Sequence, residues 1–353
     1  TVLLKAGPAA GVTFLIHSMK LKVNEEILDL TQLCDVDERT VYGNDGAVRG
    51  QFDPQSADDL ISVSRHVASA VANAQVEPVA FSEVQPLDAP WSQSSRDGIG
   101  FAVGTYGMST IEVTLGDELN QRHNALITGA VGQGKSNLIS VVVHSLCQRY
   151  SPSEVEFYML DFKEGVTLQA FAPDPHTGSF LPHARVLGLD ADREYGVNVL
   201  RHLFAIYRQR MATFKAAGVQ NIRQYRLADP EAVMPRIVVV IDEFQMLFAD
   251  QDTVATTASD LIVKGARLFR ACGIHFILAS QTIGSGGMLG GTTGQALFAQ
   301  IPVRLALKNS LAESHATLGL KNDAASHIRS REAIVNLDYG ELSSNRKTTI
   351  AYA

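Results

Sequence analysis

The sequence has few cysteines and no long apolar run. Its 353 residues include three cysteines, Cys34, Cys147 and Cys272, which lie far apart. This spacing argues against a disulfide framework or a cysteine metal site and fits a reducing compartment. No apolar stretch is long enough to span a bilayer, and the first residues lack the basic start and cleavage site of a signal peptide. We therefore expect a cytoplasmic chain without a membrane segment of its own, which leaves room for an anchor outside this sequence.

The sequence also lacks an excess of positive charge. Its formal net charge is −7, whereas proteins that coat nucleic acid are usually basic overall. Double-stranded DNA in a narrow, locally basic channel stays compatible with this balance. Hydrophobic residues make up 46% of the chain, enough for a large core, and the length suggests two domains or one large domain with an appendage.

Residues 129–136 form the most informative motif, a complete phosphate-binding loop of the form G-x-x-x-x-G-K-[ST]. A short apolar run precedes it and a segment with helical apolar spacing follows it, which is the strand–loop–helix context that the motif requires. Backbone N–H groups and the helix N-terminus would face the phosphates. Lys135 would reach the β- and γ-phosphates, and the Ser136 hydroxyl would bind Mg²⁺. We predict that ATP is held by Gly129, Ala130, Val131, Gly132, Gln133, Gly134, Lys135, Ser136 and Asn137.

Polar residues follow two further apolar strands. Asp242 and Glu243 come directly after the strand at 237–241. A carboxylate at such a strand end can hold Mg²⁺, which we assign to Asp242. Glu243 can orient or deprotonate the attacking water. Gln281 ends the next strand and could contact the γ-phosphate or the water as a sensor; the alternative is an amide that only caps the strand end.

Two arginines precede that second strand. Arg270 would point away from the nucleotide of its own subunit, but in a ring it could reach the γ-phosphate of a neighbour as an arginine finger. Arg267, one turn earlier, is the second candidate. The alternative for either is a surface arginine paired with a nearby acid.

From about residue 117 strand and helix patterns alternate, which predicts an α/β fold with a mostly parallel sheet covered by helices. Residues 193–217 carry an apolar stripe typical of a helix that packs on a core, 98–116 alternate like a β-hairpin, and 54–73 read as a helix. The composition of 76–98 is that of a linker. The predicted strands are Ala125–Thr128, Val155–Asp161, Ala184–Leu189, Ile237–Ile241, Ile274–Ser280 and Val303–Leu307.

We expect two parts in the chain, a smaller α/β appendage with linker over 1–97 and an ATPase domain over 98–353. Residues 11–18 faintly resemble 273–280. The appendage could therefore be the tail of a preceding, degenerate ATPase domain, although chance similarity between eight apolar-rich residues is the alternative.

The segment from about 98 to 353 resembles the motor domain of the FtsK–SpoIIIE branch of the HerA–FtsK ATPases. The resemblance implies a RecA-like fold, a hexameric ring and ATP-driven translocation of double-stranded DNA. It also implies the roles given above for Lys135, Ser136, Asp242, Glu243, Gln281 and Arg270. The matching pieces are 129–136, 160–163, 216–222, 242–244, 270–275, 280–282 and 301–304, which includes Arg304, a family arginine to which we assign no task.

The substrate stays open between two kinds of motor. The chain ends without room for the DNA-reading winged helix of the segregation motors, and 161–163 resembles the version in EccC, the type VII secretion ATPase, equally well. The main hypothesis is a DNA motor in phage defence, restriction or DNA transfer, with Arg223, Arg226, Lys264 and the loop 283–291 as candidate pore contacts or ordinary surface groups. The alternative is a protein-secretion ATPase. A nucleotide-gated scaffold with little turnover is disfavoured by the intact Asp242–Glu243 pair.

Overall fold

The computed structural model describes residues 34–37, 40–43, 47–51, 57–73, 78–85, 89–107, 109–163, 167–283, 289 and 291–353. The chain divides into two compact units, Thr1–Glu77 and Pro78–Ala353. In the first unit, β1 (Cys34–Asp37), β2 (Thr40–Gly43) and β3 (Val48–Gln51) form an antiparallel sheet, and α3 spans Ala57–Asn73. The predicted helix at 54–73 is thus α3, whereas the strand expected at 11–18 lies outside the described residues.

The described strands of the second unit form one sheet. Their bounds are β4 Val79–Ala80, β5 Ile99–Tyr106, β6 Ser109–Leu115, β7 Ala125–Thr128, β8 Val155–Asp161, β9 Ala184–Gly188, β10 Arg236–Asp242, β11 Ile274–Ser280, β12 Val303–Leu307, β13 Glu332–Asn336 and β14 Asn345–Tyr352. The strands β12-β7-β11-β10-β8-β9 run parallel in this spatial order. On the far side of β12, the strands β13, β14, β5 and β6 continue the sheet in antiparallel pairs, and β4 pairs with β14.

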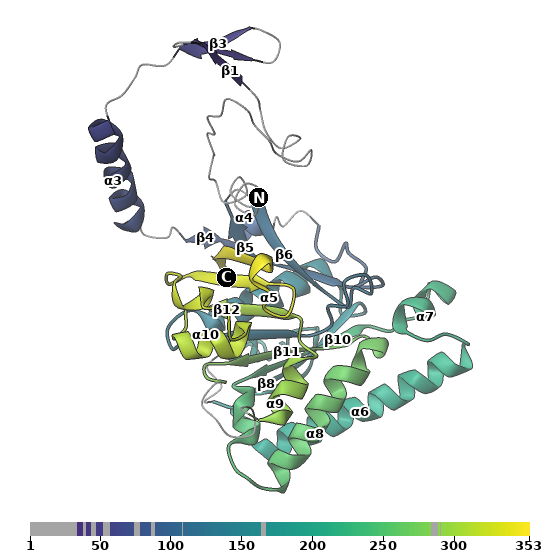
Figure 1. Ribbon diagram of the computed structural model, residues 1–353. Coiled ribbons are helices and arrows are strands. Elements are labelled where there is room, and N and C mark those ends of the chain that lie inside the picture. The colour runs from purple at the N-terminus through teal and green to yellow at the C-terminus, as the bar shows by residue number, and fades with distance from the viewer. Residues whose placement is uncertain are drawn as a thin grey trace. The chain divides into compact units, whose positions relative to one another are not determined.

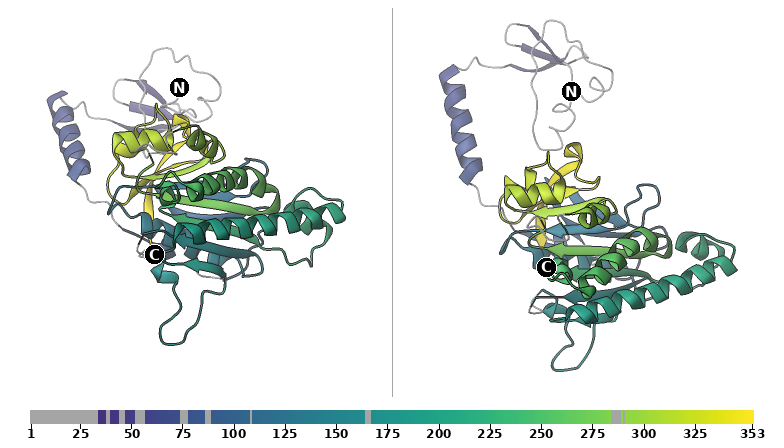
Figure 2. Two further views of the ribbon diagram at one scale, coloured as in Figure 1. Left: turned by 90° about the horizontal axis from the view of Figure 1, so that it is seen from below. Right: turned by 60° about the horizontal axis from the view of Figure 1, so that its bottom comes forward.

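Helices cover both faces of the parallel part (Figure 1). Side chains of α5 pack into one hydrophobic cluster, while those of α6 and α8 pack into a second cluster on the opposite face. Figure 2 shows α6 and α8 lying together along that face. The described helices of this unit are α4 Phe81–Val84, α5 Lys135–Arg149, α6 Arg193–Ala216, α7 Ile222–Ala228, α8 Thr253–Leu268, α9 Thr292–Phe298 and α10 Leu311–Leu318. None of the described helices is long and apolar enough to cross a membrane.

The central strand β10 shows why its sequence is apolar without alternation. Val238 and Val240 pack into the cluster under α5, whereas Val239 and Ile241 pack into the cluster under α6 and α8. All four are at most 1% exposed. A strand buried on both faces needs apolar residues at every position, so the run at 237–241 is confirmed as a central parallel strand.

The apolar stripe of α6 is confirmed as a core face. Val197, Leu200 and Phe214 are buried in the cluster that α6 shares with α8. The Asp192 carboxylate accepts a hydrogen bond from a backbone N–H of the first turn. Gly218 takes a φ of +68° directly after the helix, the left-handed conformation that commonly ends helices.

The predicted α/β fold with a largely parallel sheet is therefore confirmed. Four predicted strands match β7, β8, β11 and β12 to the residue, β9 ends one residue early, and β10 extends one residue at each end. The hairpin at 98–116 is β5 and β6. We did not predict β13, a short strand that pairs antiparallel between β12 and β14, because its five residues carry no pattern that separates them from a buried loop.

The segment expected to be a linker packs on the second unit. The compact units divide between Glu77 and Pro78, not between 97 and 98 as the composition indicates. Residues 89–97, which we call the strap, hydrogen-bond to the end of α5: Trp91 donates from its backbone N to the carbonyl of Gln148 at 2.8 Å and from Nε1 to that of Cys147 at 3.0 Å. These carbonyls belong to the last turn of the helix, which lacks intrahelical partners.

Arg236, the first residue of β10, holds the other end of the strap. Its guanidinium donates to the carbonyls of Ser95 and Arg96 and lies 3.2 Å from Nε2 of His275. Arg236 is 2% exposed, and this burial lowers the pKa of its guanidinium to about 10. Three polar groups therefore depend on one buried cation.

Replacing Arg236 with methionine is expected to lower the free energy of unfolding by about 2–3 kcal/mol, because two strap carbonyls lose a charged donor and one of them belongs to the buried Ser95. Denaturant unfolding measures this loss. The matched control is Arg208→Met, since Arg208 is exposed and its Nε donates within its own helix to the carbonyl of Phe204. Equal stability of the two variants would show that Arg236 does not anchor the strap.

Candidate nucleotide site

The phosphate-binding loop joins the carboxyl end of β7 to the start of α5. Within it, Gly132 and Gly134 adopt φ angles of +75° and +97°, a region that L side chains rarely enter. A Cβ atom added at either position would have no protein atom within 4 Å. The two glycines therefore let the backbone turn around an open space, the shape that a phosphate chain requires.

Two backbone hydrogen bonds hold this loop, one to another segment and one within the loop. The N–H of Ala130 donates to the carbonyl of Lys308 at 3.0 Å, and that of Gln133 donates to the carbonyl of Ala130 at 3.1 Å. The first N–H groups of α5 have no intrahelical acceptor and carry the partial positive charge of the helix end. The predicted residues thus suit an anion, with one exception among the side chains: Asn137 donates to the carbonyl of Ala351 and faces β14.

Lys135 lies against the two acids predicted to act with it. Its Nζ contacts Oδ1 of Asp242 and lies 2.9 Å from Oε1 of Glu243. The three side chains are at most 6% exposed. Burial of charges is costly unless they are paired, so these residues form one ionic cluster at the carboxyl end of the sheet.

Glu243 is held in a strained and well-defined position. Its φ is +51°, unusual for a residue with a side chain and characteristic of functional sites. Oε2 accepts a hydrogen bond from Nε2 of Gln245 at 2.5 Å and a longer one from the backbone N of Gln281 at 3.4 Å. Burial acts to raise the pKa of Glu243, but the hydrogen bonds from Gln245 and Lys135 outweigh it and lower the pKa below its ordinary value. The carboxylate is therefore ionised at neutral pH.

A third acid and its segment complete this edge of the sheet. Asp161 ends β8 and is the in-register neighbour of Asp242. It is fully buried, and this burial together with the charge of Asp242 raises the pKa of its carboxyl. Close to it, the Thr167 hydroxyl lies 2.9 Å from that of Ser136, and Nζ of Lys163 donates to Oε1 of Gln281 at 3.3 Å. We did not predict a role for Asp161, Lys163 or Thr167, although a carboxylate at the end of a strand beside β10 was a signal.

Arg270 and Arg267 lie away from this cluster. Arg270 belongs to a 3-10 helix, η4 (Phe269–Cys272), which precedes β11, whereas Gln281 follows the other end of that strand. Seven residues of strand span roughly 20 Å, so Arg270 and Gln281 sit at opposite edges of the sheet. Both arginines are exposed, and neither guanidinium makes a hydrogen bond or ion pair with the residues that the structure describes. The structure thus does not bring them to the nucleotide loop of their own subunit.

The other arginines named from the sequence have partners inside the domain. Arg304 is 8% exposed and donates to the carbonyls of Phe298, Ile301 and Thr317. These bonds tie the start of β12 to its neighbouring loops and helix, so Arg304 has a structural role.

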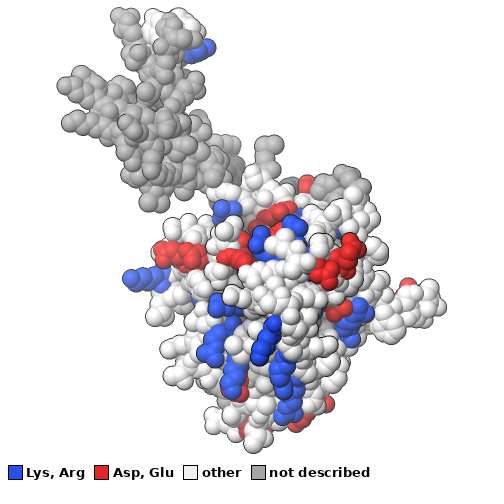
Figure 3. Space-filling view, turned by 90° about the vertical axis from the view of Figure 1, so that its right-hand side faces the viewer, with Lys and Arg blue, Asp and Glu red and all other residues white. Residues whose placement is uncertain are grey.

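The three cations named as candidate DNA contacts are paired with acids, whereas most of the candidate loop 283–291 lies outside the described residues. Arg226 pairs with Glu154, Arg223 with Asp97 and Lys264 with Asp260, at 2.6–2.7 Å. On the face that Figure 3 views, Lys and Arg side chains gather in the lower part and Asp and Glu side chains in the upper part. This face therefore carries both signs of charge, and many of its positive side chains lie together in one part of it.

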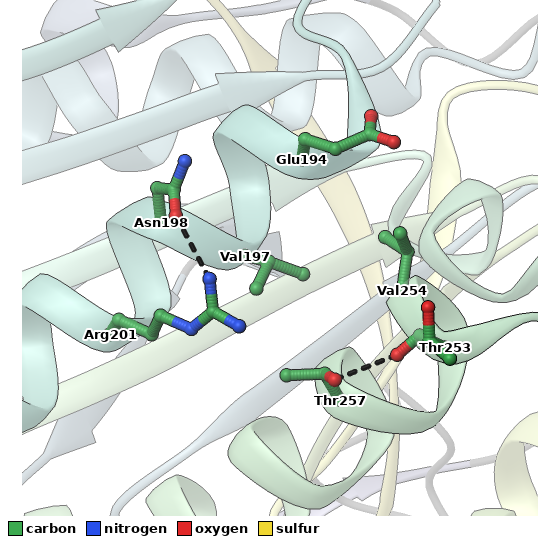
Figure 4. Close-up of a pocket in the computed structure, with 7 residues that line it drawn as sticks. All are labelled: Glu194, Val197, Asn198, Arg201, Thr253, Val254 and Thr257. Carbon is green, nitrogen blue, oxygen red and sulfur yellow. Dashed lines mark hydrogen bonds between the residues drawn. The ribbon is translucent and has the colours of Figure 1, made fainter.

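A separate groove lies between α6 and α8 (Figure 4). Its polar groups bond within their own helices: Arg201 donates to Asn198 at 3.1 Å, and the Thr257 hydroxyl donates to the carbonyl of Thr253 at 2.7 Å. Glu194, Val197 and Val254 complete the lining. The groove shares no residue with the ionic cluster of Lys135.

Known proteins resemble the chain in sequence and fold. The ESX-5 secretion system protein EccC5 of Mycobacterium tuberculosis is 29% identical over 58% of the chain and 14% of its own length. The DNA translocase FtsK of Oceanobacillus iheyensis is 28% identical over 79% of the chain and 34% of its own length. The chain thus spans well under half of either relative. The cytoplasmic domain of the type VII secretion ATPase EccC from Thermomonospora curvata superposes with a TM-score of 0.64 at 21% identity, over 78% of this chain and 32% of that one, which shows a shared fold.

The sequence pattern of one family covers more than half of the chain. It matches residues 89–285, which include the strap, the phosphate-binding loop, the Asp242–Glu243 pair and Gln281. The protein is therefore a member of the FtsK/SpoIIIE family of P-loop ATPases.

Proposed function

We propose that the protein hydrolyses ATP and uses the energy to move a polymer substrate. The observation that carries this proposal is the buried cluster of Lys135, Asp242 and Glu243 beside an open glycine loop. A lysine, a metal-binding acid and a strained, ionised acid at the carboxyl end of parallel strands are the parts that phosphoryl transfer from ATP requires.

Each residue has a task in this reaction. The loop N–H groups and Lys135 bind the β- and γ-phosphates. Ser136 and Asp242 offer the oxygen ligands that Mg²⁺ prefers. Mg²⁺ would neutralise charge on the phosphate oxygens.

Glu243 accepts the proton of the water whose oxygen attacks the γ-phosphorus, while the bond to the bridging oxygen of ADP breaks. Gln281 is placed to orient that water, because the hydrogen bond from its backbone N to Glu243 holds this residue beside the carboxylate.

We further propose that the active form is a homo-oligomeric ring, a hexamer as in the motors that the chain resembles. Arg270 is exposed at the sheet edge opposite the nucleotide loop and has no acidic partner among the described residues. A guanidinium in that place is too far from the nucleotide loop of its own subunit to serve it, and in a ring it would stabilise the charge that develops on a neighbour's γ-phosphate. We place this activity on the cytoplasmic side, by analogy with the cytoplasmic domain of EccC.

We infer that the substrate is a polypeptide, as in a type VII secretion ATPase. The reasons are the secretion proteins among its relatives, the net charge of −7 and the pairing of Arg223, Arg226 and Lys264 with acids. Double-stranded DNA is the second candidate, favoured by the match to a DNA translocase over 79% of the chain.

Turnover with and without long linear double-stranded DNA tests this choice. For a polypeptide motor, we expect ATP turnover to change by less than about twofold when DNA is added at low salt, because the three cations considered as DNA contacts are already paired with acids and would release few counterions from DNA. Strong stimulation that high salt abolishes would make the protein a DNA motor. Lys135→Ala serves as the blank, and wild-type turnover equal to this blank would contradict ATP hydrolysis itself.

A further inference from the structure

Two lysines flank the catalytic carboxylate. On one side, Nζ of Lys135 lies 2.9 Å from Oε1 of Glu243. On the other side, Oε2 of Glu243 accepts from the backbone N of Gln281, whose side-chain Oε1 accepts from Nζ of Lys163 at 3.3 Å. Polar contacts thus link Lys135, Glu243, Gln281 and Lys163, and Gln281 contributes its backbone N on one side and its side-chain oxygen on the other.

Lys163 has no acidic partner among the residues that the structure describes. Among the described residues, no carboxylate lies within ion-pair distance of its Nζ, and its one side-chain partner is the neutral amide of Gln281. Lys135, in contrast, contacts two acids. An exposed ammonium at the ATP-facing edge of the sheet is therefore available for an anion.

Asp161 determines where Lys163 sits. Its Oδ1 accepts from the backbone N of Lys163 at 2.9 Å, and its Oδ2 accepts from that of Thr167 at 3.2 Å. Its own carbonyl accepts from the N–H of Ala191 at 2.8 Å. One fully buried carboxylate thus holds both ends of the segment, and β8 holds the carboxylate in register beside Asp242.

The same segment reaches the other end of the phosphate site. The Thr167 hydroxyl lies 2.9 Å from the Ser136 hydroxyl, and Thr167 is buried. Residues 161, 163 and 167 therefore connect the serine of the phosphate loop with the side chain of Gln281.

We propose that Lys163 is a second phosphate-facing cation that recognises the γ-phosphate of ATP, and that Asp161 is the residue that positions it. This inference rests on the proposed ATP hydrolysis at the same site. An ammonium beside Gln281 gains an anionic partner only when a γ-phosphate is present, so it distinguishes ATP from ADP. The Lys163–Gln281 contact then links the nucleotide state to the sensor.

Equilibrium binding of ATPγS and of ADP, each with Mg²⁺, tests this proposal. Lys163→Gln is expected to weaken ATPγS binding roughly tenfold, the loss of one charge-assisted hydrogen bond, and to leave ADP binding within about twofold. Lys163→Arg should restore most of the ATPγS affinity because it keeps the charge. Lys215→Gln, which changes an exposed lysine at the end of α6, is the matched control and should alter neither affinity.

Two results would overturn the role of Lys163. One is unchanged ATPγS affinity in Lys163→Gln. If that variant also lost stimulation by a polymer substrate, the lysine would be reassigned to substrate contact. The other is an equal loss for ATPγS and ADP, which a merely structural role would produce. Failure of the wild-type protein to bind ATPγS better than Lys135→Ala would instead contradict the proposed function.

Asp161→Asn separates positioning from folding. It keeps the side-chain shape and one acceptor oxygen. We therefore expect ATPγS affinity to fall more than ADP affinity, as in Lys163→Gln, but by a smaller factor. A lowered melting temperature without any change in the ratio of the two affinities would remove Asp161 from the positioning role.

Discussion

Replacing Arg270 with alanine is expected to lower ATP turnover by roughly 10³-fold or more while nucleotide affinity stays close to wild type. An arginine finger contributes about this much to phosphoryl transfer because its charge is needed in the transition state. Arg270 lies at the edge of the sheet opposite Gln281, so its removal leaves the phosphate loop and its binding contacts intact. Steady-state turnover and equilibrium ATPγS binding measure the two effects separately.

Mixing two inactive variants tests whether Arg270 acts on a neighbour. Arg270→Ala subunits keep Glu243, and Glu243→Gln subunits keep Arg270, so an interface between them holds one complete site. We expect the mixture to regain turnover that neither variant shows alone. Normal turnover by Arg270→Ala would show that it is not the finger, and loss of turnover in Arg267→Ala alone would transfer the role to Arg267.

Replacing Glu243 with glutamine is expected to lower turnover by about 10²–10⁴-fold, the usual contribution of a general base. The amide has the same shape and can keep a hydrogen bond with Gln245, but it cannot take the proton of the attacking water. The pKa of Glu243 lies below its ordinary value, so the wild-type group is an ionised base at neutral pH. ATP should still bind, and the variant should stall with ATP in place.

Single-turnover hydrolysis together with ATP binding measures this outcome. Glu231→Gln is the matched control, because Glu231 is an exposed acid in the turn before β10. This change should alter neither hydrolysis nor ATP binding. Brisk hydrolysis by Glu243→Gln would assign the base to another group at this edge, such as Asp161, the in-register neighbour of Asp242.

Local residue patterns predicted the scaffold because burial acts on each segment by itself. A strand covered on both faces must be apolar throughout, so 237–241 could be recognised as β10. A phosphate loop needs glycines at left-handed positions, so Gly132 and Gly134 could be read from the motif. Parallel strands bring their carboxyl ends to one edge, and this placed Asp242, Glu243 and Gln281 together before any coordinates were known.

Contacts between distant segments were not predictable in the same way. The strap was expected to be a linker because its composition is that of a loop, and only its partners on α5 and Arg236 show that it packs. Arg226 was a candidate DNA contact by sequence, but in the structure it forms an ion pair with Glu154. Arg304 likewise matched a family arginine, but its task is to satisfy three carbonyls.

The sequence by itself thus determined the α/β sheet, the phosphate loop and the acids of the site. Only the tertiary structure determined which charged side chains are paired inside the domain and which remain exposed and able to bind an anion. Lys163 and Gln281 are 118 residues apart, and both end up at the carboxyl edge because β8 and β11 flank β10. A charged side chain has no period or composition that reveals its partner, since its energy depends on which group lies within a few ångströms.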